Sequence, residues 1–254
     1  MARGPSPRND AARRGGQAQR ADDPVAAVMI AEEALKMSPS SSWASHAVLG
    51  FCCAKGDWAG ALSIIDNNQT AGLIDKATYR RQRGVLLTAR ALELETVDRD
   101  LSRSSAMEAV KLAPTLIPAA VLSAKFESEA HQVRRAMRIV ETAWLKQPHP
   151  DLADAYSHVR LGDSARQRLV RVETLAAKTP GNIEGALAIA RAAIDAAEFG
   201  KARAALEPFR AATPERDTTC ATNGKAMYSF STCFAALRLS SAMSASNASR
   251  ARSS

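Results

Sequence analysis

Five prolines divide the central part of this 254-residue chain at a nearly constant interval. Pro114, Pro148, Pro180 and Pro214 follow one another after 34, 32 and 34 residues, and Pro39 precedes Pro114 by 75 residues. Alanines recur five residues before some of these prolines (Ala34, Ala109 and Ala143) and twelve residues before some (Ala27, Ala136 and Ala202). Alanines seven apart lie on one helix face, where their small size lets another helix approach, and proline ends the helix. The interval therefore predicts an array of similar helical units.

Each unit is expected to be a hairpin of two helices, because turn-forming residues precede the alanine-bearing helices. The candidate turns are Gly56-Asp57-Trp58 before Ala61, Ala197-Glu198-Phe199 before Ala202, and Gly162-Asp163-Ser164 before Arg168, which stands where alanine is expected. A period near 34 residues with small residues at these places is typical of the tetratricopeptide repeat (TPR). The predicted fold is all-α: a right-handed superhelical solenoid of TPR-like helix hairpins, with about five helix pairs.

Composition agrees with a helical chain, since aromatic residues are only 5%, and there are few glycines and prolines for the turns of a β-sandwich. The expected helices span residues 25–37, 42–54, 58–68, 76–95, 98–112, 116–129, 132–146, 151–161, 164–178, 183–196 and 200–212.

Three regions differ in composition. Residues 1–24 are rich in Arg, Gly and Pro without periodicity and are predicted to be a disordered basic tail. Residues 25–214 form the predicted TPR-like domain. Residues 215–254 are a Ser/Ala-rich tail, in which Met227, Phe230, Phe234 and Leu237 recur at helical spacing. They predict either a short capping helix at 227–241 or no stable structure.

The net charge of +8 lies mostly in the two tails, so nucleic acid is not an expected partner of the repeat domain. Four cysteines without a CxxC spacing indicate neither a disulfide framework nor a zinc site. The sequence contains no apolar run long enough to span a membrane, and no secretory signal, so a cytoplasmic location is expected for the chain as given. The oligomeric state is not predicted.

Catalysis is not expected, because the sequence lacks GxSxG, HExxH, GxxxxGK and GxGxxG, and its carboxylates are scattered. No cofactor, no metal and no catalytic residue is predicted. The cluster Arg80-Arg81-Gln82-Arg83 has two interpretations, a contact with phosphate or an acidic partner and a solvated helix face, of which the second is favoured. Cys52 and Cys53 are interpreted as packing residues rather than as a redox pair.

Four segments carry a resemblance to a known family: AEEALKMSP, GDWAGAL, DKATYRRQRGVLLTARALE and AMEAVKLAPTLIPA. Together they resemble the bacterial HemY-type TPR protein that is associated with haem biosynthesis, over residues 28–212. The resemblance implies a protein-interaction scaffold whose partners are enzymes of late haem (protohaem, porphyrin) synthesis. It also implies anchoring at the inner membrane through an N-terminal domain for which this chain has no counterpart.

Two alternatives remain open beside this interpretation. One is a tetrapyrrole-binding carrier that uses the concave groove, although His46, His131, His149 and His158 are not expected to be haem ligands. The other is a truncated fragment without an intact function.

Partner peptides of TPR arrays usually lie against the first helix of each hairpin. Carrying that pattern onto this sequence predicts a partner-binding groove lined by Trp43, His46, Cys53, Leu87, Leu94, Lys125, Glu129, Ser157, Arg160, Glu184, Arg191 and Asp195. The set mixes charged and apolar groups and lacks the Lys/Asn set that clamps a terminal carboxylate in chaperone-binding members. We therefore expect a protein partner other than a chaperone tail.

Overall fold

A computed structural model of the chain describes residues 24–38 and 40–209, so the terminal tails and the capping helix predicted at 227–241 lie outside the described residues. Within them are eleven α-helices, one 3-10 turn and no strand. The helices are α2 (Pro24–Met37), α3 (Ser42–Lys55), α4 (Trp58–Thr70), α5 (Lys76–Leu94), α6 (Arg99–Leu112), α7 (Ile117–Glu129), α8 (Val133–Trp144), α9 (Pro150–Ser157), α10 (Ala165–Ala176), α11 (Ile183–Asp195) and α12 (Phe199–Leu206). The all-α prediction is confirmed, and the fold is an array of TPR-like hairpins.

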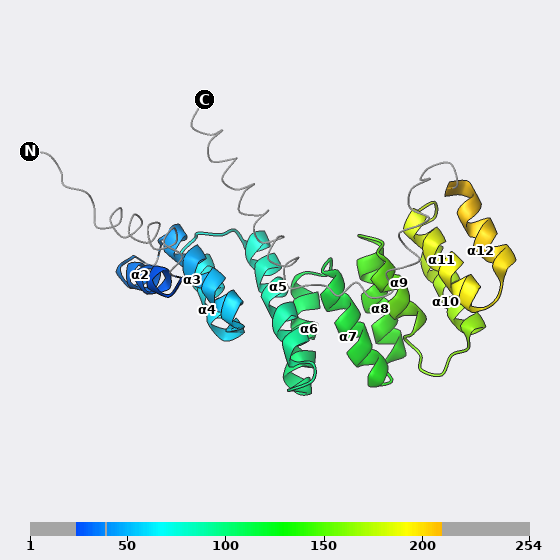
Figure 1. Ribbon diagram of the computed structural model, residues 1–254, viewed down its shortest axis with the longest axis horizontal. Coiled ribbons are helices and arrows are strands. Elements are labelled where there is room, and N and C mark those ends of the chain that lie inside the picture. The colour runs from blue at the N-terminus through cyan, green and yellow to red at the C-terminus, as the bar shows by residue number, and fades with distance from the viewer. Residues whose placement is uncertain (1–23, 39, 210–254) are drawn as a thin grey trace, which may run out of the picture. The chain divides into compact units, whose positions relative to one another are not determined.

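Five hairpins follow α2 along the described chain: α3–α4, α5–α6, α7–α8, α9–α10 and α11–α12. Figure 1 shows consecutive helices lying side by side, such as α5 with α6 and α11 with α12. The chain divides into two compact units, of which the first ends at Ala143 and the second begins at Trp144. No helix between Pro24 and Phe209 is both long and apolar enough to cross a membrane.

Side chains satisfy open N–H groups at several helix starts, including two of the three predicted turns, whereas Glu198 in the third makes no such bond. The Asp57 carboxylate accepts a hydrogen bond from the Gly60 amide at 2.9 Å, and Asp98 accepts one from Leu101 at 3.0 Å. Ser164 forms a capping box with Gln167 at the start of α10. Gly56 ends α3 with a φ of +73°, a left-handed conformation that glycine adopts without strain.

Small buried residues stand at one fixed place in the second helices of the hairpins, four residues after the N-terminal cap. Ala61, Ser102 and Ala136 are 0% exposed there, and Ala202 is 7% exposed. Because these side chains are short, the two helices of a hairpin approach closely. Arg168 occupies the same place in α10 and is only half-buried.

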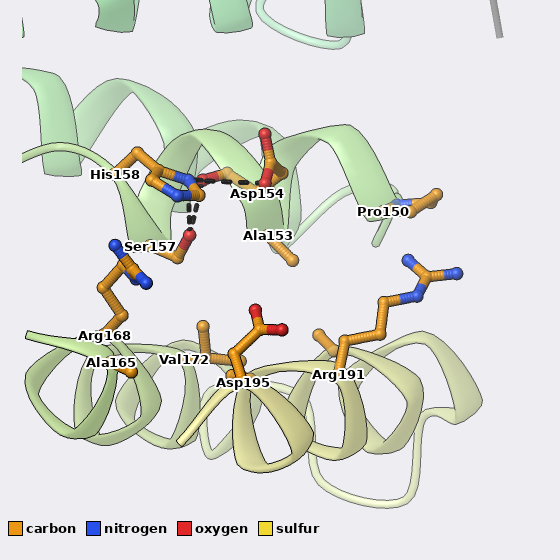
Figure 2. A pocket seen from close by; sticks show the side chains of 12 residues that line it. Pro150, Ala153, Asp154, Ser157, His158, Ala165, Arg168, Val172, Arg191 and Asp195 are labelled. Atoms are coloured by element: carbon orange, nitrogen blue, oxygen red, sulfur yellow. Dashed lines mark hydrogen bonds and ion pairs between the residues drawn. The ribbon is translucent and has the colours of Figure 1, made fainter. Parts of the chain in front are cut away.

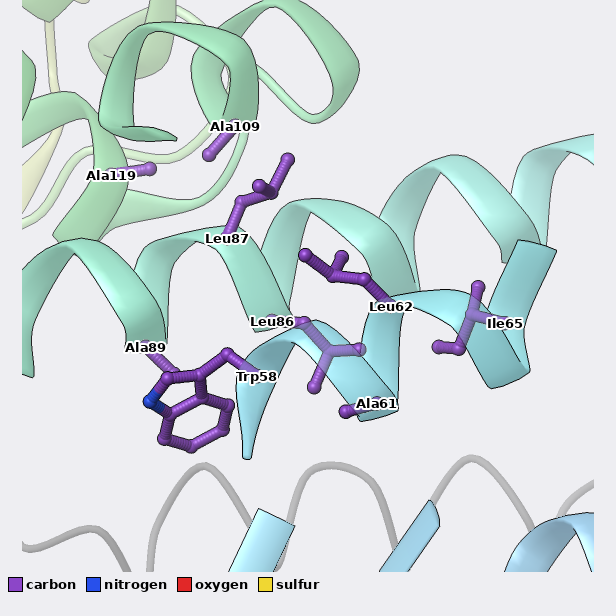
Figure 3. Packing of buried hydrophobic residues seen from close by; sticks show 9 residues of the cluster. All are labelled: Trp58, Ala61, Leu62, Ile65, Leu86, Leu87, Ala89, Ala109 and Ala119. Carbon is purple, nitrogen blue, oxygen red and sulfur yellow. The ribbon is translucent and has the colours of Figure 1, made fainter. Parts of the chain in front are cut away.

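The core of the first unit is built from apolar side chains of several hairpins. Figure 3 shows one cluster, in which Trp58, Ala61, Leu62 and Ile65 of α4 meet Leu86, Leu87 and Ala89 of α5 and Ala109 and Ala119 of the next two helices. The Trp58 indole Nε1 also donates a hydrogen bond to Glu93 at the far end of α5. Glu127 of α7 is 1% exposed and pairs with Arg103 at 3.0 Å and Arg135 at 3.3 Å, which ties α6 and α8 to α7.

The core of the second unit centres on large side chains that are almost fully inaccessible. Trp144, Leu152, Tyr156, Leu169 and Leu175 are each 0–1% exposed. The Trp144 indole Nε1 donates a hydrogen bond to Thr179 Oγ1 at 2.8 Å, so its one polar atom is satisfied.

Two helices end at least four residues earlier than predicted. The helix predicted at 200–212 ends at Leu206 and continues as a 3-10 turn over Glu207–Phe209, where Pro208 has no backbone N–H to donate to the carbonyl four residues earlier. The helix predicted at 151–161 ends at Ser157. There the Ser157 hydroxyl donates to the Asp154 carbonyl at 2.8 Å, a side-chain bond that competes with continued helix.

Substitutions of Ala61 and of the exposed Ala59 on the same helix test the close helix packing at the buried alanine position. Ala61→Leu is expected to destabilise the protein by about 2 kcal/mol, because an added isobutyl group has no room at a fully buried site. Ala59 lies on the same helix but is exposed, so Ala59→Leu should change the unfolding free energy little. Chemical denaturation of both variants measures the difference. Equal stability of the two would contradict the packing described here.

Candidate functional site

A cavity that is open to solvent lies in the second unit between α9 and α11, the first helices of their hairpins, with α10 behind them. Figure 2 shows the lining side chains facing one another across this space. They are Pro150, Ala153, Asp154, Ser157, His158, Ala165, Arg168, Val172, Ala188, Arg191, Ala192 and Asp195. The floor therefore contains several alanines, and the rim carries charged and polar groups.

The α9 side of the cavity is an internally bonded polar edge. His158 Nδ1 lies 2.8 Å from Ser157 Oγ, 3.0 Å from the Asp154 carbonyl oxygen and 3.3 Å from Asp154 Oδ1. Asp151 N donates to His149 Nδ1 at the start of the helix, which fixes where α9 begins. The short helix thus holds its polar groups in place through local bonds.

The opposite side is formed by α10 and α11. In Figure 2 the guanidinium of Arg168 lies toward Ser157, and the carboxylate of Asp195 points toward α9. Neither side chain has a hydrogen bond or an ion pair with another described residue, whereas Arg191 does. The cavity therefore contains one positive and one negative side chain that are not paired with another described residue.

The turn before α10 is fixed by a buried ion pair. Asp163 and Arg171 contact each other with side chains that are 6% and 15% exposed. Together with the Ser164 capping box, this pair determines where α10 starts and therefore where Arg168 emerges.

Three of the predicted groove residues meet in this cavity: Ser157, Arg191 and Asp195. Arg160 is exposed outside it and lies 3.9 Å from Asp163. Glu184, in the first turn of α11, does not line the cavity. Part of the predicted set in this unit is thus assembled at one place.

The predicted groove residues of the first unit have other surroundings. Lys125 pairs with Glu95, and Glu129 pairs with Arg99, so both ion pairs join α7 to the preceding hairpin. His46 is exposed, while Trp43 and Leu94 are half-buried. No cavity among those described for this chain gathers these residues.

One predicted groove residue is corrected by the structure. Leu87 is 2% exposed and belongs to the apolar cluster of α4, α5 and α6, so it cannot reach a partner. The helical repeat pattern predicted that Leu87 lies on the open inner face of α5. In the structure Ala109 of α6 and Ala119 of α7 pack in the same cluster and cover it.

The basic cluster of α5 serves the fold. Arg83 pairs with Asp66 at 2.6 Å and with Glu108 at 3.1 Å. Arg80 donates to the Lys111 carbonyl at 3.3 Å, near the end of α6. Because Arg83 is already paired with two carboxylates, the cluster is less suited to bind phosphate.

Among the charged or polar residues of the cavity, three were not predicted as groove residues: Asp154, His158 and Arg168. Arg168 could have been found from the sequence, because it replaces the alanine of the repeat pattern. Asp154 and His158 have no such signal in the repeat pattern.

The neighbouring thiols of α3 are poorly suited to redox chemistry. Burial raises the pKa of Cys53 to about 11, with a smaller contribution from Cys52. The pKa of Cys52 is also raised, first by burial and then by the charges of Asp57 and Glu32. Thiolate is the reactive form, so both groups are disfavoured as nucleophiles. No group of His, Cys, Asp and Glu suited to a metal ion occurs among the described residues.

Comparisons with known proteins give distant relatives. No family model matches the chain. Over 148 residues the chain is 28% identical to the probable magnetosome protein Mms48 of Magnetospirillum gryphiswaldense, a match that covers 58% of this chain and 33% of that protein. The chain thus spans about a third of the curated relative that it matches.

Several solved structures are similar at low identity. TTC0263, a thermophilic TPR protein of Thermus thermophilus, is 15% identical, with 74% of this chain and 99% of that chain covered and a TM-score of 0.34. The type IV pilus biogenesis factor PilW is 15% identical, with 84% and 97% covered and a TM-score of 0.38. YrrB, a TPR protein with an unusual peptide-binding site, is 13% identical, with 68% and 87% covered and a TM-score of 0.38.

The thiol environment leads to a prediction about alkylation. At pH 8 a rise in pKa from 9.0 to about 11 leaves Cys53 with about a hundredfold less thiolate than an ordinary cysteine. Iodoacetamide should therefore modify Cys53 much more slowly in the folded protein than in guanidinium, and the rate should rise steeply toward pH 11. Tandem mass spectrometry distinguishes Cys53 from Cys52. Equal rates in the two states at pH 8 would contradict the burial.

The ion pair at the turn before α10 also leads to a prediction. Asp163→Asn should destabilise the protein by about 3 kcal/mol, because it leaves the Arg171 guanidinium buried without its counter-charge. The double variant Asp163→Asn, Arg171→Met removes both charges and should recover part of this loss. Urea unfolding of the single and double variants measures the effect. A double variant whose loss of stability equals the sum of the two single losses would show that the pair is not coupled.

Proposed function

We propose that this chain is a non-catalytic, TPR-type scaffold for protein–protein interaction, and that the cavity between α9 and α11 receives a peptide segment of a partner. The observation that carries the proposal is the pair of unused charges, Arg168 and Asp195, on the rim of that cavity. Because neither side chain is paired with another described residue, both are available to bind a partner.

The lining favours a peptide over a metabolite. Ala153, Ala165, Ala188 and Ala192 keep the floor shallow and apolar, so a main chain can approach it closely. Binding sites for small molecules are commonly lined by larger hydrophobic and aromatic side chains, which this cavity lacks. Stacked hairpins also supply a preformed surface, which reduces the entropy lost on binding.

The resemblance to the HemY-type family supports a narrower proposal, in which the partners are enzymes of late haem synthesis at the inner membrane. It rests on the four quoted sequence segments alone. No contact among the described residues selects such enzymes.

The tetrapyrrole carrier is the contrasting proposal, and His158 on the cavity rim is the one residue that would favour it. An absorbance titration with haem separates the two proposals. A carrier should saturate at one haem per chain with a shifted Soret band, whereas the scaffold should show no saturable site. Cooperative unfolding of the recombinant chain would argue against a damaged fragment.

The scaffold proposal predicts that displayed peptides can be selected on this chain and that they occupy the cavity. Asp195→Lys should weaken the selected peptides at least about tenfold, because it reverses an unused rim charge. Asp100→Lys, an exposed reversal on α6, is the matched control and should leave binding unchanged. Fluorescence polarisation measures both. The absence of any selectable peptide, or equal binding by the two variants, would overturn the proposal.

A further inference from the structure

Arg168 departs from a rule that the other hairpins follow. Four residues after the cap, the other second helices place Ala61, Ser102, Ala136 and Ala202, all of them buried. These positions lie where the two helices of a hairpin touch. A guanidinium is too large for such a contact, and the Arg168 side chain extends into the cavity, where it lies toward Ser157 of α9.

This arginine has no hydrogen bond or ion pair with another described residue. Its neighbours Leu169 and Val172 supply the buried apolar surface of α10, with 1% and 2% exposure. The capping box of Ser164 and Gln167 begins the helix without it. The Arg168 side chain is therefore not needed to position α10.

The surrounding arginines differ from Arg168 in having partners. Arg160 and Arg171 both face Asp163, and Arg166 lies 3.9 Å from Glu198. Arg168 has no such counter-charge among the described residues and is already half removed from water. A peptide that covers the guanidinium must therefore supply an anionic group. Otherwise the guanidinium loses its hydration without compensation, which weakens binding.

We propose that Arg168 determines the specificity of the cavity by selecting one acidic side chain, Asp or Glu, in the bound peptide. This inference rests on the proposed function. A guanidinium offers a planar pair of donors that matches a carboxylate in two parallel hydrogen bonds. Asp195 on α11 repels a second acidic group, so the preferred peptide carries a single acidic side chain at this position, with apolar or basic neighbours.

The experiment uses synthetic peptide pools whose ends are acetylated and amidated, so that no terminal carboxylate is present. One pool fixes Glu at its centre, one fixes Gln, and the flanking positions vary without Asp or Glu. A third pool has Gln at the centre and a free terminal carboxylate. The full chain is immobilised, and the retained fraction of each pool is measured.

The wild-type protein should retain the Glu pool about tenfold more than the Gln pool, as expected for one charge-assisted contact. Arg168→Gln should bring this ratio to about one. Arg168→Lys should keep a reduced preference, because a lysine cannot form the paired bonds. The matched control Arg166→Gln, two residues away on α10, should keep the wild-type ratio.

The melting temperature is the second readout. Arg168→Gln should melt at or above the wild-type temperature, since the side chain has no partner in the fold, so loss of the preference cannot be ascribed to unfolding. A preference for Glu that persists in Arg168→Gln overturns the inference but leaves the scaffold proposal intact. So does stronger retention of the terminal-carboxylate pool than of the Glu pool. Retention of no pool by the wild-type protein overturns the scaffold proposal itself.

Discussion

Close approach of neighbouring helices is the constraint on which this structure depends. With so few aromatic residues, the chain cannot fill wide gaps between helices and instead brings backbones together over alanine, serine and glycine. A Cβ added at Gly84 would lie 3.1 Å from the Ala113 Cβ, and one added at Gly185 would lie 3.2 Å from the Ala176 Cβ. Within each unit, neighbouring hairpins bury one another's apolar faces, so a hairpin does not have a complete core of its own.

Two large side chains, Trp58 and Trp144, are buried among these small residues. Each indole N–H donates a hydrogen bond to a residue 35 positions later, Glu93 and Thr179 respectively. That separation is close to the repeat interval. The Trp58 bond joins α4 to α5 and so holds one hairpin against its successor within the first unit.

The sequence was informative about the fold because its signals are local and periodic. Proline spacing and small residues predicted nearly all of the helices, and the errors came from Pro208 and from the side-chain bonds around Ser157. The site was harder to predict, since the helical period cannot show which inner-face residues a neighbour covers. Leu87 is covered, Lys125 and Glu129 are paired, and Ser157, Arg191 and Asp195 reach a cavity. The arginine in place of alanine at position 168 was visible in the sequence, but the cavity that it lines was not.

The ion pairs between hairpins have a consequence for how such an array can change. Lys125 with Glu95 and Arg99 with Glu129 each join residues 30 positions apart, and in the two pairs the acidic member stands once in the earlier and once in the later hairpin. Removing or duplicating one hairpin would bring together side chains that were never matched, and like charges could face each other. The hairpins share one plan but differ in charge, so these ion pairs favour the order in which the hairpins occur along the chain.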